Sequence, residues 1–122
     1  MKYMVMHYSN EANEADAPPT PEHIAAVGQY IGEAAQAGIL LAAEGVRASS
    51  HGARVTVENG RVTVTDGPFA EAKELIAGFA ILEVDSLAEA VEHARKWAQV
   101  VGTHRVDVRK VVEVEDLLPP QG

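Results

Sequence analysis

The stretch Val64-Thr65-Asp66-Gly67-Pro68-Phe69-Ala70-Glu71-Ala72-Lys73-Glu74 decides how the whole chain is interpreted. Asp-Gly-Pro is a strong turn signal, because glycine tolerates positive φ and proline fixes its own φ. The turn follows one strand-like run and leads into a nearly continuous apolar run, Leu75 to Val84. That second pattern is typical of a central strand whose two faces are both buried.

Upstream of this turn, the sequence predicts a β-hairpin. The runs 54–58 and 61–65 alternate β-branched with polar residues, and Asn59-Gly60 joins them. Asn-Gly between two alternating runs is the strongest short hairpin signal, because both residues tolerate positive φ. We therefore expect a hairpin inserted between the flanking elements.

The remaining elements follow from hydrophobic periodicity and capping residues. Strands are predicted at 3–8, 39–48, 75–84 and 105–115, with a polar loop at 9–20 and a tail at 117–122. Thr20 and Pro21 open a helix that ends at Gly38, and Ser86 to Glu89 form a capping box for a second helix. The order βαβ, hairpin, βαβ predicts an α+β, ferredoxin-like sheet of strand order 4-1-3-2 with both helices on one face.

The predicted central strand carries apolar side chains on both sides. Ala80, Leu82 and Val84 point one way, and Phe79 and Ile81 point the other. The helices cover one side of the sheet, so the other side needs a second cover. We expect a homodimer with the two sheets face to face, a dimeric α/β-barrel assembly.

Composition narrows the classes of function. The chain of 122 residues predicts one domain, 1–122, and contains no cysteine, which fits a reducing cytoplasm. Its formal net charge of −8 with no basic patch disfavours nucleic acid as a partner. No apolar run approaches the roughly 20 residues of a membrane-spanning helix, and the first residues do not resemble a signal peptide, so no membrane partner is expected.

Several short motifs carry a family resemblance. They are Met1-Lys2-Tyr3-Met4, Ala37-Gly38-Ile39-Leu40, Glu44-Gly45, Thr65 to Phe69, and Gly78-Phe79. Together they resemble proteins of the YCII-related family of the DGPF type. The resemblance implies a dimeric α/β-barrel of ferredoxin-like protomers. Some family members are proposed to act through a His–Asp pair, a few are linked to ring-cleavage or dehalogenation steps, and others accompany sigma-factor-like regulators.

The His–Asp proposal transfers to this chain only in part. In the members that use it, the histidine lies in the first helix, and counting back from Leu40-Leu41 puts that position near Val27. His23 lies one turn earlier and could reach the mouth of a pocket. Asp66 matches the signature itself and is not clearly the acid of the pair.

The sequence offers three candidate acid–base residues and a set of candidate ligand-binding residues. Asp66 is either an acid–base group, with His23 or His7 as partner, or the side chain of an Asx-type turn. His7 shares a face with Tyr3 and Val5 and could reach the cavity between sheets. Ligand-binding candidates are Gly67, Pro68, Phe69, Glu71, Lys73, Phe79, Arg109 and Glu44. For the signature residues and Arg109 the alternative is a purely structural role.

Two functions remain open at this point. No histidine pair has the spacing of a helical metal site, and nucleotide-binding glycine motifs are missing, so we expect neither metal nor cofactor. One hypothesis is a dimer that binds, or performs acid–base chemistry on, a small organic acid or ring compound, at the open mouth of the cavity between its sheets. The other is a non-catalytic regulatory or structural dimer, associated with a sigma-factor-type regulator.

Overall fold

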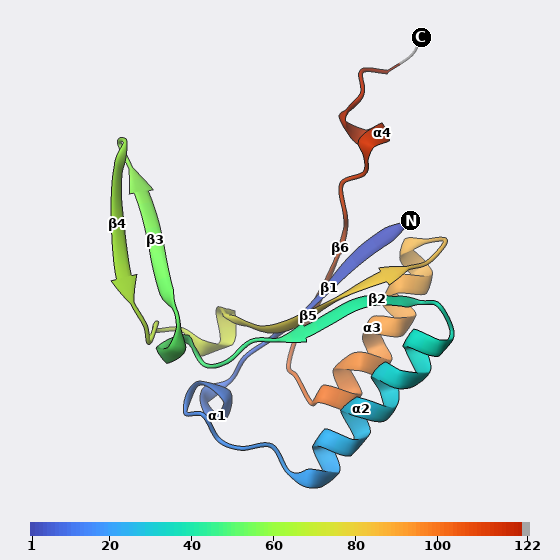
Figure 1. Cartoon of the computed structure of the whole chain (residues 1–122), viewed down its shortest axis with the longest axis horizontal. Helices are drawn as coiled ribbons and strands as arrows, with labels where there is room; N and C mark the ends of the chain where they lie inside the picture. The colour runs from blue at the N-terminus through green and yellow to red at the C-terminus, as the bar shows by residue number, and fades with distance from the viewer. Residues whose placement is uncertain (121–122) are drawn as a thin grey trace.

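The main sheet has four antiparallel strands in the order β2-β5-β1-β6 (Figure 1). The computed structural model describes residues 1–120. The strands are β1 (Lys2–Tyr8), β2 (Leu40–Gly45), β5 (Ile76–Glu83) and β6 (Val106–Lys110). If these four strands are numbered 1 to 4 in chain order without the hairpin, their order from β6 to β2 is 4-1-3-2, as predicted. The strand β5 is central, as expected.

The register of the sheet sorts its side chains into two faces. Val5 lies opposite Ala80 on β5 and Val108 on β6; Val5 and Ala80 belong to the buried core, and the partly buried Val108 packs against it. The neighbouring positions face the other way, where Met6 lies opposite Phe79. Alternation along each strand therefore gives one face to the helices and leaves a second apolar face.

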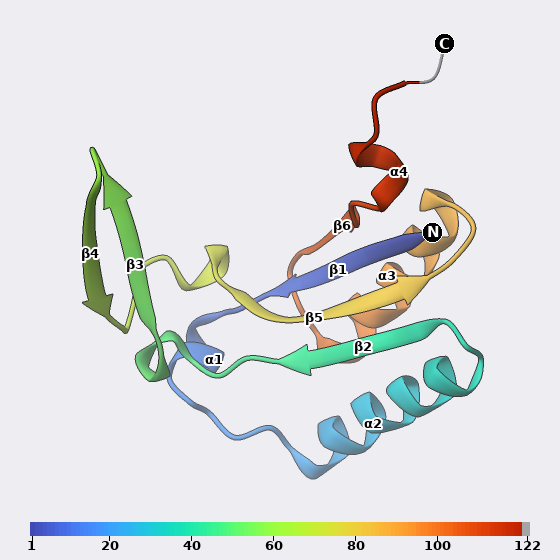
Figure 2. The same ribbon diagram turned by 45° about the horizontal axis from the view of Figure 1, so that its top comes forward.

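Both long helices, α2 (Pro21–Gln36) and α3 (Leu87–Val101), lie on the same side of the sheet (Figures 1 and 2). Their starts are capped as predicted. The Thr20 hydroxyl accepts from His23 N at 3.1 Å, and the Ser86 hydroxyl accepts from Glu89 N at 3.2 Å. Trp97 on α3 is 7% exposed and packs into the core between both helices and the sheet.

The predicted hairpin forms a separate two-stranded sheet, β3 (Ala53–Glu58) with β4 (Arg61–Asp66). Its turn uses positive φ at Asn59 (50°) and Gly60 (79°), as the Asn-Gly signal requires. In both views the ribbon stands away from the main sheet at one end of the molecule (Figures 1 and 2). All of its residues are exposed, so the hairpin contributes nothing to the core.

Two predicted segments differ from the structure. The polar loop 9–20 contains a short helix, α1 (Glu11–Glu14), because the Asn10 side chain accepts from Asn13 N and caps it. The last strand ends at Lys110 rather than at 115, and α4 (Val114–Leu117) follows. Asp116 accepts from Glu113 N, so a helical turn replaces the strand there and enters the predicted tail. The tail's residues 121–122 lie outside the described ones.

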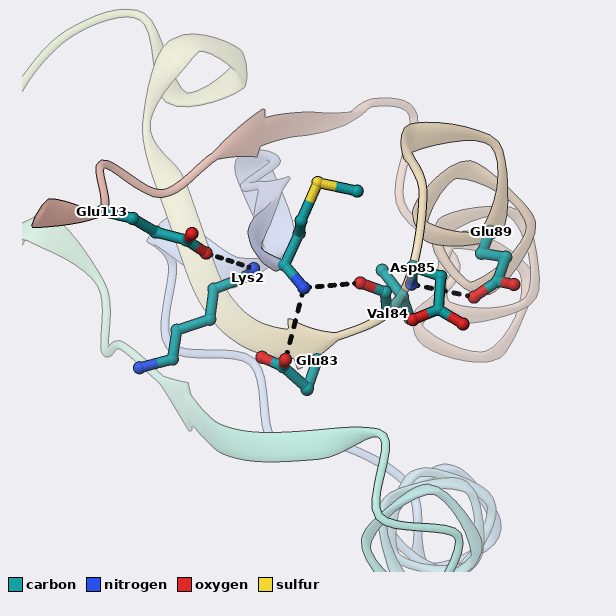
Figure 3. A network of polar contacts seen from close by, with 7 residues as sticks. Lys2, Glu83, Val84, Asp85, Glu89 and Glu113 are labelled. Atoms are coloured by element: carbon teal, nitrogen blue, oxygen red, sulfur yellow. Dashed lines mark hydrogen bonds and ion pairs between the residues drawn. The ribbon is translucent and has the colours of Figure 1, made fainter. Parts of the chain in front are cut away.

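A network of polar contacts joins the start of β1 to the end of β5 (Figure 3). The amino group of Met1 donates to Val84 O at 2.8 Å and to Glu83 Oε1 at 3.2 Å. Lys2 N donates to Glu113 Oε1 at 3.3 Å. These bonds hold one end of the sheet, and the cavity described below lies at the other. Within residues 1–120, no helix has the length and apolar character needed to cross a membrane.

Candidate functional site

The signature turn is held by backbone packing against the 3₁₀ turn η1 (Ser49–His51). Gly67 N donates to Gly52 O at 3.0 Å, and Phe69 N donates to Ser49 Oγ at 2.9 Å. A Cβ on Gly67 would lie 1.7 Å from Ser49 O. Gly67 does not adopt positive φ, so the left-handed conformation is not what requires glycine here. Glycine is required here because two backbone segments come too close for any side chain.

Hydrogen bonds of Ser49 connect the signature turn to α1. Ser49 N donates to Glu14 Oε1 at 3.0 Å, and the Ser49 hydroxyl donates to Glu14 Oε2. A second contact nearby joins His51 Nε2 and Asp16 Oδ2 at 2.8 Å. These bonds connect the hairpin base to the first loop of the chain and give the signature turn a structural role.

Asp66, the acidic residue of the signature turn, takes no part in these hydrogen bonds through its side chain. The Asp66 side chain is exposed and makes no hydrogen bond to any residue from 1 to 120, so the Asx-type turn is not formed. The Phe69 ring lies under the Arg54 guanidinium, 4.1 Å from ring centroid to Cζ. Farther along, Glu71 adopts left-handed backbone (φ 68°), and its side chain and that of Lys73 are exposed without pairing to each other.

A pocket of about 810 Å³ opens on the helix-covered side of the sheet, where β1 ends. We call it the terminal pocket. It lies between the first half of α2, the end of α3, the end of β2 and the loop before α2. Apolar walls come from Ile24, Val27, Ile31, Val46, Trp97 and Val101, and polar groups from His7, His23, Arg47 and Thr103. The expected site was on the uncovered side of the sheet, whereas most of the lining of this cavity lies on the helix-covered side; Glu44 and Phe79 border it from the face that the helices leave uncovered.

His7 is held at the floor of the terminal pocket by Trp97. The Trp97 indole Nε1 donates to His7 Nδ1 at 3.3 Å, and the two rings meet edge to face with centroids 5.6 Å apart. Burial lowers the pKa of His7 below its usual value, which favours the neutral imidazole. The prediction that His7 reaches the uncovered face is wrong, because the face it shares with Val5 is the one that the helices cover.

The space for the His7 ring comes from a glycine on the neighbouring strand. Gly78 lies opposite His7 in the sheet and is buried. A Cβ at this position would lie 2.5 Å from His7 Cε1 and 2.8 Å from Glu44 O. This role of Gly78 was not predicted from the sequence. A glycine inside an otherwise apolar strand is the signal that could have revealed it, because such glycines mark a close approach of another group.

The terminal pocket brings together some predicted residues and not others. His7, His23, Glu44 and Phe79 border it, as does Val27, where the family's proposed histidine would fall. Arg109 instead lies beside Met4 in the sheet and borders a separate groove between α3 and β6. The signature residues are not among those that border the pocket: Asp66, Gly67, Pro68, Phe69, Glu71 and Lys73.

The bordering residues that were not predicted as site residues include Trp97, Arg47 and Thr103. The sequence places Trp97 on the apolar face of the second helix, but nothing in the sequence indicates that it contacts His7. The Thr103 hydroxyl donates to Tyr8 O at 2.9 Å and thereby fixes the end of α3 against the end of β1. Within residues 1–120, no three His, Asp or Glu side chains are grouped closely enough to hold a metal ion.

Comparison with known proteins identifies the family. The family model of the YCII-related domain matches residues 1–115. The chain belongs to the YCII-related family. A search of curated proteins finds no match. Among solved structures, the protein is similar to the 5-chloro-2-hydroxyhydroquinone dehydrochlorinase of Burkholderia phenoliruptrix, in complex with 2,5-dihydroxybenzoquinone. The TM-score is 0.53 at 12% identity, over 94% of this chain and 97% of that one, and at this identity the likeness concerns the fold alone.

Proposed function

We propose that this YCII-related protein binds a small organic molecule in the terminal pocket. The observation that carries the proposal is the pocket itself, about 810 Å³, in which apolar side chains of both helices and of β2 and its end are combined with polar groups such as His7, His23 and Arg47. Sites for small ligands commonly have this size and composition. Polar groups fix the ligand's orientation, and the apolar walls supply most of the binding free energy.

Two observations support the proposal of a small-molecule ligand. The position where the resemblance puts the family's histidine, Val27, borders the terminal pocket. The structurally similar dehydrochlorinase was solved with a ring compound, 2,5-dihydroxybenzoquinone. A compact ring compound or small organic acid is therefore the ligand class that we favour here.

Acid–base chemistry, if the protein performs it, belongs in our proposal to His23 rather than to Asp66. His23 lies in the first turn of α2, is partly buried and borders the terminal pocket. Asp66 is exposed on the hairpin and does not border it. A group that exchanges protons with a ligand must lie within hydrogen-bonding reach of it.

The experiment that tests ligand binding uses two glycines of α2. A Cβ on Gly28 or on Gly32 meets no atom within 4 Å, and only Gly28 borders the pocket. A library of phenols, quinones and small carboxylic acids is screened for compounds that raise the melting temperature. Gly28→Leu should abolish a hit by filling the pocket, whereas Gly32→Leu should retain it. A hit unaffected by Gly28→Leu, or no hit from the whole library, would contradict the proposal.

We also propose that the protein is a homodimer with its uncovered sheet faces packed together. Met4, Met6, Phe79 and Ile81 lie on the face opposite the helices and are only partly buried in one protomer. An apolar face of this kind is usually covered by another element or another chain. Sedimentation should give about twice the 13.0 kDa chain mass. Ile81→Glu should shift the protein to the monomer, because an unpaired charge would be buried in the interface.

One observation favours a second function, that of a regulatory or structural module. Cross-strand pairs Val55–Val64 and Val57–Val62 give the hairpin an apolar face on which every valine is 62% to 64% exposed. Exposed apolar faces of this kind often bind other proteins, and a sigma-factor-type regulator is the partner that we propose in this case. A purified sigma-factor-type regulator should bind the parent protein and should not bind the Val57→Lys variant, while the ligand screen stays negative.

A further inference from the structure

The ring of His7 has two nitrogens in different surroundings. Nδ1 accepts a hydrogen bond from Trp97 Nε1 at 3.3 Å. An indole N–H is a donor and never an acceptor, so Nδ1 must hold a free lone pair. A neutral imidazole carries its single proton on the other nitrogen. The contact with Trp97 therefore selects the tautomer of His7 in which Nε2 is protonated.

The second nitrogen, Nε2, is free to meet a ligand. No residue from 1 to 120 makes a hydrogen bond with Nε2. If Nε2 were buried, it would be a buried polar atom without a partner, and residues 1–120 contain no such side-chain atom. Nε2 is therefore accessible, and the space that His7 borders is the terminal pocket. Gly78 makes this orientation possible, because any larger residue would collide with Cε1 of the ring.

We propose that His7 presents Nε2–H to the terminal pocket as a fixed hydrogen-bond donor, with Trp97 as its positioning residue. The proposal rests on the proposed function of the pocket and specifies the ligand's chemistry. The ligand carries an acceptor oxygen, such as a carbonyl or phenolate oxygen, on a compact apolar body. His7 is then a binding group and not a general base, because its only accessible nitrogen already holds a proton.

The proposal also states which ligands the pocket rejects. A ligand group with only N–H donors, such as an ammonium, would face Nε2–H without an acceptor and would leave both donors unsatisfied. A purely hydrocarbon ligand would leave Nε2–H desolvated without a partner, which reduces its affinity. Selection therefore falls on the acceptor oxygen and not on ring size alone.

The first test measures the tautomer in the free protein. Long-range ¹H–¹⁵N correlation spectra of the ¹⁵N-labelled protein near pH 7.5 distinguish the two nitrogens of each histidine. We expect the unprotonated nitrogen of His7 to be Nδ1. Trp97→Phe should allow both tautomers, because it removes the indole N–H that bonds to Nδ1. An Nδ1-protonated ring in the parent protein would overturn the proposal.

The second test compares two probes of equal shape. Acetophenone has a carbonyl oxygen, and α-methylstyrene has a methylene group in its place. Titrations followed by backbone amide shifts of pocket residues should show acetophenone binding about three- to tenfold more tightly, as one hydrogen bond predicts. His7→Phe should abolish this preference, and His7→Gln, which keeps an N–H donor, should restore part of it.

The outcomes separate this inference from the proposed function. If both probes shift pocket residues equally and His7→Phe changes nothing, the pocket binds ligands and the donor role is wrong. If neither probe shifts pocket residues but the tautomer is as predicted, the donor is present and the proposed function is wrong for ligands of this class. A preference for acetophenone that is lost in His7→Phe supports both the donor role of His7 and ligand binding in the terminal pocket.

Discussion

The signature turn and the terminal pocket are built in opposite ways. The turn, Asp66 to Phe69, is continuous in sequence and packs on one short segment, Ser49–His51. The pocket combines residues from distant parts of the chain, among them His7, His23 and Trp97. The most recognisable motif of this sequence therefore stabilises a backbone junction, whereas polar groups suited to a ligand gather elsewhere.

The first prediction tests the turn and has the largest expected effect. Gly67→Ala places a Cβ 1.7 Å from Ser49 O, so the two backbone segments must separate. We expect the free energy of unfolding to fall by about 3 kcal/mol, the upper part of the range for overpacking. Urea denaturation followed by circular dichroism measures the change.

Gly52→Ala is the matched control for the turn. Gly52 accepts from Gly67 N in the same junction, but its own Cβ would meet Ser49 O at an ordinary 3.7 Å. This variant should stay within about 1 kcal/mol of the parent. Equal stability of both variants would show that close backbone approach is not what requires glycine at Gly67.

The second prediction tests the floor of the terminal pocket. Gly78→Ala brings a Cβ within 2.5 Å of His7 Cε1 and 2.8 Å of Glu44 O. The ring can move but the backbone oxygen cannot move freely, so we expect a loss of about 1–3 kcal/mol. Gly45→Ala is the control, because its Cβ meets nothing closer than Ala77 O at 3.9 Å. If Gly78→Ala costs no more than Gly45→Ala, the pocket floor is not closely packed.

The third prediction concerns pH and follows from the lowered pKa of His7. The unfolded chain binds a proton at His7 near its ordinary value of about 6.5, and the folded state binds one only at lower pH. Stability from this residue is therefore complete above about pH 6.5 and falls as pH decreases toward the folded-state pKa. The slope from one proton is at most about 1.4 kcal/mol per pH unit.

Denaturation midpoints between pH 7.5 and pH 5 measure this dependence. His7→Phe should flatten it relative to the parent, because the variant has no proton to bind at that position. His104→Gln, at an exposed site near the start of β6, is the control for removing a histidine elsewhere in the chain. A parent curve as flat as that of His7→Phe would contradict the assignment of a buried neutral imidazole.

The fourth prediction has the smallest expected effect. Asp66→Asn should change the free energy of unfolding by less than about 0.5 kcal/mol, because the exposed Asp66 carboxylate makes no hydrogen bond to residues 1–120. Affinity for any hit of the ligand screen should also be unchanged. A large loss of either would restore Asp66 as a functional residue and would weaken the contrast between turn and pocket.

Local patterns in the sequence predicted most of the elements and their order. Thr20 and Ser86 cap the helices as expected, because an N-cap depends on bonds within one turn. Asn59-Gly60 closes the hairpin for a similar reason, since its positive φ values are set by two adjacent residues. The strand order then followed from general rules on short connections between strands and helices, and it agrees with the structure.

Contacts between distant segments were decided only by the tertiary structure. Periodicity placed His7 on a face with Val5, but not on the helix-covered face beside Trp97. Gly67 was correctly recognised as special, but its reason, the backbone of Ser49, lies 18 positions away in sequence. Local signals determine backbone conformation within a few residues. Which faces meet depends on packing the whole chain, so the signature turn could be predicted from sequence and the terminal pocket could not.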